Sequence, residues 1–367
     1  MSAAEPVSAI PDPHKAIRLW LILVAVLVFA MVVVGGATRL TDSGLSITEW
    51  RPVTGTLPPL THTQWLAEFA KYQASSQYDL VNRGMSLADF QFIFWWEWAH
   101  RLLGRVIGAA MLLPWLFFLM RGRLDRRLAA VTFGIGLMIG FQGLVGWLMV
   151  ASGLNPGMVA VAPLKLMFHL TLACLIFAAL VWVALGLKPV RDRGPVSARL
   201  RFGGFAVLVL IVVQIMLGAL VAGNDAGMRF NDWPLMDGAL VPPLGQLFDK
   251  PSTLEAFVDS LALTQFNHRL GAYALFALAL WHMLAARGSG FAKSATVLFG
   301  LITAQAIIGI TTLILVVPLW AGLLHQAFAV LVLGHAVAHA HGLARARRLP
   351  ENPSAPAAAM APMERAA

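Results

Sequence analysis

The sequence predicts an all-α integral membrane protein with eight transmembrane helices, arranged as two parallel repeats of a four-helix bundle. Three observations predict this fold. The chain is 59% hydrophobic and only 12% charged, its apolar runs are long, and its motifs recur in the same order. Soluble domains carry about 25% charged residues, so an ordinary soluble fold is excluded. The net charge of +9 is typical of basic cytoplasmic loops and does not indicate nucleic-acid binding.

Eight apolar runs reach the roughly 20 residues that a helix needs to cross a bilayer. They are predicted over residues 17–38, 99–120, 128–150, 164–187, 201–222, 267–287, 293–317 and 320–343. The first run is too long for the apolar core of a cleavable signal peptide, and no small-x-small cleavage site follows it. Long loops over 39–98 and 223–266 follow the first and fifth helices.

Basic residues fall on one side of the predicted membrane and orient the chain. They lie at Lys15 and Arg18, in the loops 121–127 and 188–201, at Arg287 and Lys293, and at 345–348. The positive-inside rule then places both termini in the cytoplasm. We expect a cytoplasmic tail over 1–16 and a disordered Pro/Ala-rich tail over 346–367. The N-terminus does not resemble a transit peptide, which favours a bacterial inner membrane.

The motifs indicate two copies of a four-helix unit. The segment 35–60 corresponds to 218–244, EWAHRLLG (97–104) to QFNHRLG (265–271), and FQGLVG (141–146) to AQAIIG (304–309). An even number of helices per copy gives both copies the same orientation, related by an axis along the membrane normal. We therefore expect an N-terminal half over 17–190 and a C-terminal half over 191–345.

Four of the ten histidines correspond across the repeat: His100, His169, His268 and His325. Each lies within about two turns of the start of an even-numbered predicted helix, so all four rings are expected at the outer side. Two neutral imidazoles that face each other within an apolar bundle are what a bis-histidine haem requires. The sequence thus predicts one site in each half. Packing or capping histidines are the alternative, and zinc is disfavoured because four protein ligands do not converge on either pair.

Four further histidines lie toward the inner ends of the sixth and eighth predicted helices: His282, His335, His339 and His341. An inner haem there has no counterpart in the first half, where Pro114 takes the place of His282. We therefore expect these histidines to be interfacial side chains. The single cysteine, Cys174, excludes an intrachain disulfide.

The two halves differ three residues before a histidine, where Glu97 in one corresponds to Gln265 in the other. Residues i and i+3 share a helix face, and a carboxyl can move protons whereas an amide cannot. We expect chemistry at the first site and electron transfer at the second. The alternative is that Glu97 is a surface charge at the membrane interface.

Three arginines, Arg101, Arg105 and Arg269, follow the histidines of the two HRL motifs. A guanidinium binds a carboxylate bidentately, so we expect these arginines to pair with haem propionates. Snorkelling of the arginines to the interface is the alternative.

On these residues the sequence resembles the haem A synthase family, over about residues 17–345. The matching set is Glu97-x-x-His100-Arg101, His169, Asn267-His268-Arg269 and His325, within the duplicated eight-helix plan. The resemblance implies that the C8 methyl of haem O is oxidised to a formyl group in successive hydroxylations, giving haem A for terminal oxidases. It also implies that His268 and His325 ligate haem b. His100, His169 and Glu97 then form the site of the substrate haem.

The resemblance further implies a haem O synthase and an electron donor such as quinol as partners, and it allows a homo-oligomer. Some family members carry a cysteine pair in the first outer loop. This sequence has no such pair, which excludes a thiol-based step. In this respect the sequence resembles the proteobacterial and mitochondrial branch of the family. Two other classes stay open. One is a di-haem b cytochrome that passes electrons between quinol and a partner. The other is a transporter, which is disfavoured because the midplane holds mainly Gln142, Gln214 and Gln305 rather than ionisable groups.

Overall fold

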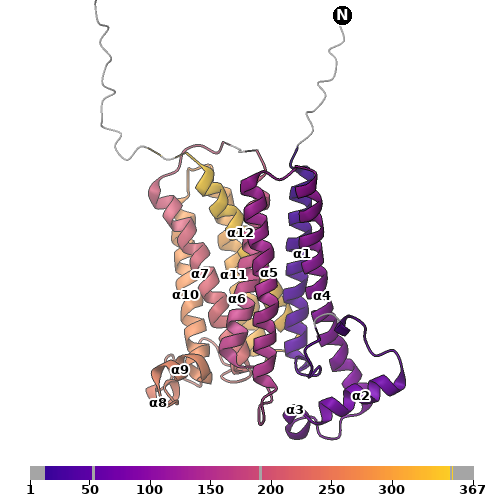
Figure 1. Cartoon of the computed structure of the whole chain (residues 1–367). Coiled ribbons are helices and arrows are strands. Elements are labelled where there is room, and N and C mark those ends of the chain that lie inside the picture. Colours follow the sequence, from indigo (N-terminus) through magenta and orange to yellow (C-terminus); the bar gives the residue numbers. More distant parts are fainter. Residues whose placement is uncertain (1–12, 52–53, 190–191, 348, 350–367) are drawn as a thin grey trace, which may run out of the picture.

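The computed structural model describes residues 13–51, 54–189, 192–347 and 349, and these form helices joined by loops (Figure 1). The long helices are α1 (Lys15–Leu40), α4 (Leu87–Met120), α5 (Arg126–Gly153), α6 (Pro163–Gly186), α7 (Ala198–Gly223), α10 (Leu261–Ala285), α11 (Ala292–Ile314) and α12 (Leu319–Arg345). The predicted tails over 1–16 and 346–367 lie largely outside the described residues.

Seven of these helices are long and apolar enough to cross a membrane, which makes the chain a multi-pass membrane protein. The eighth, α10, has 25 residues and packs beside α7 and α11. It is less apolar because it carries polar side chains, among them Gln265, Asn267, His268 and Arg269. The residues that lower its hydropathy are therefore the ones that form its predicted site.

The long helices pack as two rings of four. In the first ring, α1 and α5 each contact α4 and α6; in the second, α7 and α11 each contact α10 and α12. The rings meet reciprocally, since α1 packs on α12, α7 packs on α6, and α6 packs on α12. Such a reciprocal interface is what a two-fold relation between two similar halves produces. Within each ring the histidine-bearing helices, α4 with α6 and α10 with α12, lie diagonally opposite.

The largest buried cluster lies between the two rings and includes residues of α1, α6 and α12. Leu21, Val24, Leu180 and Leu333 are fully buried there, and Cys174 is buried beside them. Because lipid is as apolar as these side chains, close van der Waals packing, rather than escape from water, stabilises such contacts in a membrane.

Two loop regions lie at the end of the bundle opposite to the start of α1 and the end of α12 (Figure 1). The first contains η1 (Thr54–Thr56), α2 (His62–Gln73) and α3 (Ser76–Leu80), and the second contains η2 (Ala226–Met228), α8 (Leu244–Leu247) and α9 (Thr253–Asp259). We call them the first and second outer loops. The first is the larger and projects away from the bundle.

Helix α4 begins at Leu87, well before the predicted residue 99. Ser86 and Asp89 form a capping box there, which satisfies backbone N–H groups at the helix start. The first turns of α4 bury Phe90 and Phe94 in an aromatic cluster with residues of α2. Hydropathy misses this extension because these turns pack on the first outer loop and not on lipid.

Candidate functional site

The structure brings together both predicted histidine pairs at the outer-loop end of the helices. In the second ring, His268 on α10 faces His325 on α12, with ring centroids 6.5 Å apart and planes at 82°. In the first ring, His100 on α4 and His169 on α6 interact electrostatically. Each pair therefore spans the diagonal of its own ring of helices.

Each of the four rings packs against a glycine of the preceding long helix. A β-carbon built on Gly35, Gly146, Gly218 or Gly309 would lie 2.9, 2.7, 3.0 or 2.7 Å from Cε1 of His100, His169, His268 or His325, respectively. Only glycine, which lacks a β-carbon, allows the rings to lie this close without displacement. The same contact is therefore made four times, by α1 with α4, α5 with α6, α7 with α10, and α11 with α12.

Three of the histidines are also bound by a glutamine that stands four residues before the contacting glycine. The distances from the glutamine Nε2 to the histidine Nδ1 and carbonyl oxygen are 3.1 and 2.9 Å for Gln142–His169, 3.0 and 2.8 Å for Gln214–His268, and 3.1 and 3.0 Å for Gln305–His325. A side chain that is hydrogen-bonded to the non-ligating nitrogen of an imidazole fixes the orientation of that imidazole as a metal ligand. We call these three residues the tethering glutamines.

The residues present fit a haem iron. Metal–imidazole bonds of about 2 Å on each side place the centroids of two opposed rings on the order of 6 Å apart, near the 6.5 Å between His268 and His325. A metal-bound imidazole also needs an acceptor for the N–H of its other nitrogen. The tethering glutamines each carry a buried Oε1 that has no hydrogen-bond partner. Turning the side-chain amide over, which gives up the Nε2 bond to the histidine carbonyl, brings this oxygen to Nδ1 as that acceptor.

Glu97 is buried, with 3% of its surface exposed, and both carboxylate oxygens are hydrogen-bonded. Oε2 accepts from the Ser46 hydroxyl at 2.7 Å and from the Ile47 N–H at 2.8 Å. Oε1 accepts from Arg101 Nη2 at 2.6 Å. The alternative that Glu97 is a surface charge is therefore wrong: the carboxylate joins α4 to the first outer loop.

Gln265 occupies the corresponding position on α10 with the opposite polarity. Its Nε2 donates to the carbonyls of Ala226 and Arg229, at 2.8 Å each, and its Oε1 accepts from Arg269 at 2.8 Å. The carboxylate receives donors from its loop, whereas the amide supplies donors to its loop. The Glu/Gln difference therefore also matches what each loop presents.

The two arginines that follow His100 and His268 contact the outer loops. Arg101 donates to the carbonyls of Ile47 and Glu49 at 2.8 and 3.1 Å. Arg269 donates to three carbonyls of the second outer loop, those of residues 230, 232 and 235, at 2.7 to 3.1 Å. Arg105 reaches the first outer loop too, with Nη2 2.9 Å from the carbonyl of Arg51. Each outer loop is thus hydrogen-bonded to an arginine that directly follows a histidine of its ring.

A comparison with protein families gives a match over most of the chain. The model of a family described as "Cytochrome oxidase assembly protein" (COX15-CtaA) matches residues 18–337. The chain belongs to this family.

Similar proteins named heme A synthase occur in several bacteria. The protein of Methylobacterium sp. (strain 4-46) is 58% identical over 351 residues, which cover 92% of this chain and 97% of that protein. The protein of Methylobacterium nodulans is 59% identical over 320 residues, covering 86% of this chain and 89% of that protein. That of Rhizobium meliloti (strain 1021) is 51% identical over 334 residues, covering 90% of each chain.

Three of the inner-side histidines, His282, His339 and His341, are buried, which differs from the expectation that they are interfacial. His282 and His339 are each only 1% exposed, and their Nε2 atoms are hydrogen-bonded at 2.8 Å. His339 Nδ1 and His335 Nε2 bond to Ser294, at its hydroxyl and its carbonyl. Because the two facing nitrogens are in direct contact, no iron fits between His282 and His339.

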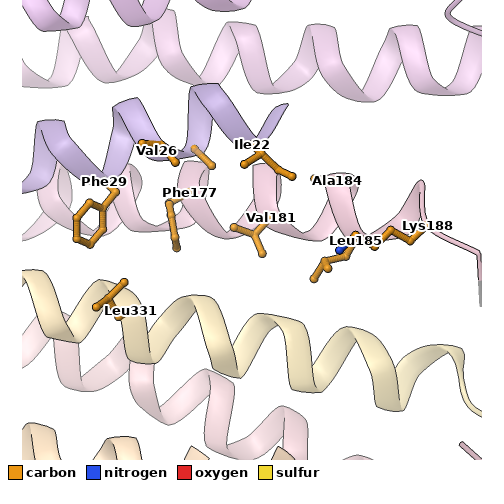
Figure 2. A pocket seen from close by; sticks show the side chains of 10 residues that line it. Ile22, Val26, Phe29, Phe177, Val181, Ala184, Leu185, Lys188 and Leu331 are labelled. Atoms are coloured by element: carbon orange, nitrogen blue, oxygen red, sulfur yellow. The ribbon is translucent and has the colours of Figure 1, made fainter. Parts of the chain in front are cut away.

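A groove of about 310 Å³ opens between α1, α6 and α12 (Figure 2). It lies toward the opposite end of the bundle from the histidine pairs, since it is lined by Ile22 near the start of α1 and Lys188 just beyond α6. Apart from Lys188 its lining is apolar, with Phe29, Phe177 and Leu331 among the side chains. It contains no haem-ligating side chain and is not the predicted site.

The sequence-based interpretation missed the tethering glutamines and treated them only as polar groups near the midplane. A signal for them exists. The pattern Gln-x-x-x-Gly occurs at 142–146, 214–218 and 305–309, each time on the long helix before a predicted ligand. Its meaning was not visible in one helix, because the glutamine and glycine act together only on a ring supplied by another helix.

Proposed function

We propose that this chain oxidises the C8 methyl of haem O to a formyl group, giving haem A for the assembly of terminal oxidases. The family match over residues 18–337, with relatives named heme A synthase that are 51% to 59% identical, carries the proposal. The substrate is thus haem O, and the chain is an oxidoreductase that acts on a C–H bond. The membrane-embedded fold supports this activity because an apolar haem can enter laterally from the bilayer.

We infer that His268 and His325 ligate a resident haem b. The 6.5 Å separation of their rings and the tethers from Gln214 and Gln305 support this assignment. When bound, a bis-histidine haem supplies electron transfer. The chain's own contribution is to orient both imidazoles and to surround them with apolar helices that exclude water.

We place haem O between His100 and His169 in the first ring. Gln142 orients His169, and Glu97 lies one turn before His100 on α4. A buried carboxyl can hold or move a proton during oxidation, and the corresponding Gln265 cannot. This asymmetry supports chemistry in the first ring and electron transfer in the second.

We assign Arg101 and Arg269 as positioning residues for the outer loops above the two sites. The loop carbonyls already accept several of their hydrogen bonds. Pairing of Arg101, Arg105 and Arg269 with haem propionates stays a prediction. A shift of haem potential in the corresponding lysine variants would support it, because lysine cannot bind a carboxylate bidentately.

We propose that all eight long helices cross a bacterial inner membrane, with both termini cytoplasmic and the outer loops periplasmic. The basic loops at the end where α1 starts and α12 finishes support this orientation. Cysteines in place of the exposed Ala74 and Leu254, one in each outer loop, should react with an impermeant thiol reagent from the periplasm. A cysteine at exposed Ala198 should not react, and buried Cys174 should give little background. Labelling of the Ala198 position alone would reverse the orientation.

We expect a haem O synthase to supply the substrate and a quinol-type donor to supply electrons. Pigment extraction tests the activity directly. Cells that make haem O should accumulate a haem with the mass of the formyl product when they express this chain, and not when they express the His100→Ala, His169→Ala double variant. A di-haem b cytochrome that only transfers electrons, the alternative function, would yield no formyl product in either case.

A further inference from the structure

Three of the four paired histidines are held by a tethering glutamine, and the fourth is not. On α5, α7 and α11 a glutamine stands four residues before the glycine that packs on the histidine. On α1 that glycine is Gly35, and the residue four positions before it is Met31. Met31 has no N–H to donate, and its thioether sulfur is a weak acceptor.

His100 is correspondingly left with an unsatisfied ring nitrogen. Its Nδ1 is buried and has no hydrogen-bond partner among the described residues. The methyl of Met31 lies against α4 close to His100, since a β-carbon on Gly104 would be 3.3 Å from it. On α1, the helix that packs against His100, Met31 therefore presents apolar atoms. At the corresponding position the other three histidines contact a glutamine amide.

The missing tether has a consequence for ligand strength. A hydrogen bond that the Nδ1–H donates to an acceptor, here the glutamine Oε1, fixes the ring orientation and makes the imidazole a more basic ligand. Its loss typically costs about 10- to 100-fold in metal affinity. A haem that stays in place is best held by two fixed ligands. A haem that must enter, react and leave needs one ligand that dissociates readily from the iron.

We propose that His100 is the releasable ligand of the substrate haem and that Met31 makes it so by withholding a tether. This inference rests on the proposed placement of haem O between His100 and His169. His169, tethered by Gln142, keeps the substrate haem oriented while His100 dissociates from it. His268 and His325, both tethered, retain their haem. Met31 is thus a positioning residue that sets the exchange rate of the first site.

The test exchanges the two side chains between the sites. Met31→Gln installs the fourth tether, and Gln214→Met removes the tether from His268. Methionine and glutamine are unbranched and similar in length. Leu103 stands three residues after His100. A leucine at that position is compatible with a tether, since Leu172 stands three residues after His169, which Gln142 binds. Met31→Leu is the matched control, because it changes the side chain without adding a donor.

Each full-length variant is purified with its haems and mixed with an excess of apomyoglobin as haem acceptor. The haems left on the protein are then extracted and separated over time. Farnesylated haem reports the first site and haem b the second. We expect Met31→Gln to slow the loss of farnesylated haem about tenfold or more and Gln214→Met to speed the loss of haem b similarly. Met31→Leu should exchange at the wild-type rate.

Unchanged release of farnesylated haem from Met31→Gln would overturn the inference and leave the proposed function intact. If Met31→Gln does not fold, Gln214→Met decides, because unchanged release of haem b would show that the glutamines do not strengthen their ligands. Wild-type protein that never carries farnesylated haem would overturn the proposed function, and the inference with it.

Discussion

The two rings of helices share one histidine–glycine contact, made four times, and differ in what surrounds it. In the second ring both histidines are tethered, and the adjacent amide of Gln265 cannot titrate. In the first ring one histidine is untethered, and a buried carboxylate lies one turn away. The fold supplies the same scaffold twice. On the assignment proposed above, a few side chains then suit one copy to retaining a haem and the other to exchanging and oxidising one.

The outer loops extend the comparison. Both are fastened to their helix by a pair of residues four positions apart, Glu97 with Arg101 and Gln265 with Arg269. The first loop is also the larger and carries its own aromatic cluster. The carboxylate accepts hydrogen bonds from its loop, whereas the amide donates hydrogen bonds to its loop. The ring of the proposed chemical site is thus the one whose outer loop is held by a charged carboxyl–guanidinium pair.

The largest expected effect comes from removing a ligand of the retained haem. His268→Ala or His325→Ala should abolish tight binding of haem b and with it all formation of haem A, because electrons no longer reach the first ring. The check is the low-spin absorption spectrum and the haem content of the purified variants. A variant that keeps a full bis-histidine spectrum would show that the ligands of the retained haem lie elsewhere.

Glu97→Gln should lower the rate of haem A formation by about a hundredfold, the usual loss when a general acid–base group is removed. Size is not the obstacle, since Gln265 shows that an amide fits beside the corresponding histidine. The amide does, however, replace an oxygen that accepts from Ser46 and Ile47 with an N–H₂ that cannot. Haem O or a hydroxylated intermediate should accumulate on the variant while haem b is retained.

Ser46→Ala separates the two roles of Glu97. It removes one hydrogen bond from the loop attachment and leaves the carboxyl in place. If Ser46→Ala slows the reaction as much as Glu97→Gln, then loop attachment accounts for the effect and proton transfer does not.

Much of this architecture could be predicted from the sequence, because its signals are local. The apolar runs predicted the long helices, and the two HRL motifs predicted two of the histidines that lie within the rings. The orientation in the membrane, inferred from the basic loops, stays a prediction. The hydrogen bonds of Glu97 could not be predicted, since they join α4 to a loop residue 51 positions earlier in the chain. The start of α4 could not be predicted either. Its first turns keep an apolar character, but they pack on the first outer loop and not on lipid. Such features depend on tertiary partners and not on composition.

A β-carbon at the glycine contact should weaken a site without removing its ligand. Gly309→Ala puts a methyl 2.7 Å from Cε1 of His325, and overpacking of this kind typically costs about 1–3 kcal/mol. We expect a raised fraction of high-spin haem b and faster haem loss. Gly300→Ala on the same helix is the control, because nothing lies within 4 Å of its β-carbon. Equal spectra for the two variants would contradict the requirement for glycine.

The smallest effect distinguishes how the two outer loops are stabilised. In the second loop, the N–H groups of Gly238 and Asp237 donate to the Asp232 carboxylate and hold its pKa below the usual 3.8. A depressed pKa means that the carboxylate contributes stability at pH values above 3.8 and loses it as the pH falls through the lower, folded value. Acid should therefore loosen this turn, whereas salt should affect it little.

The corresponding residue of the first loop, Glu49, instead makes an ion pair with Lys71 at 3.1 Å that is partly exposed. Exposed pairs contribute about 0–1 kcal/mol, and 1 M salt reduces the screening length to about 3 Å. Hydrogen exchange, corrected for intrinsic rates, should show 1 M salt loosening the peptide around Glu49 and sparing that around Gly238. As the pH falls through the folded pKa of Asp232, which lies below 3.8, the turn at Gly238 should open in the wild type, and Asp232→Asn should remove that acid response. Equal sensitivity of both loops to salt would mean that an ion pair, and not backbone hydrogen bonding, stabilises the second loop as well.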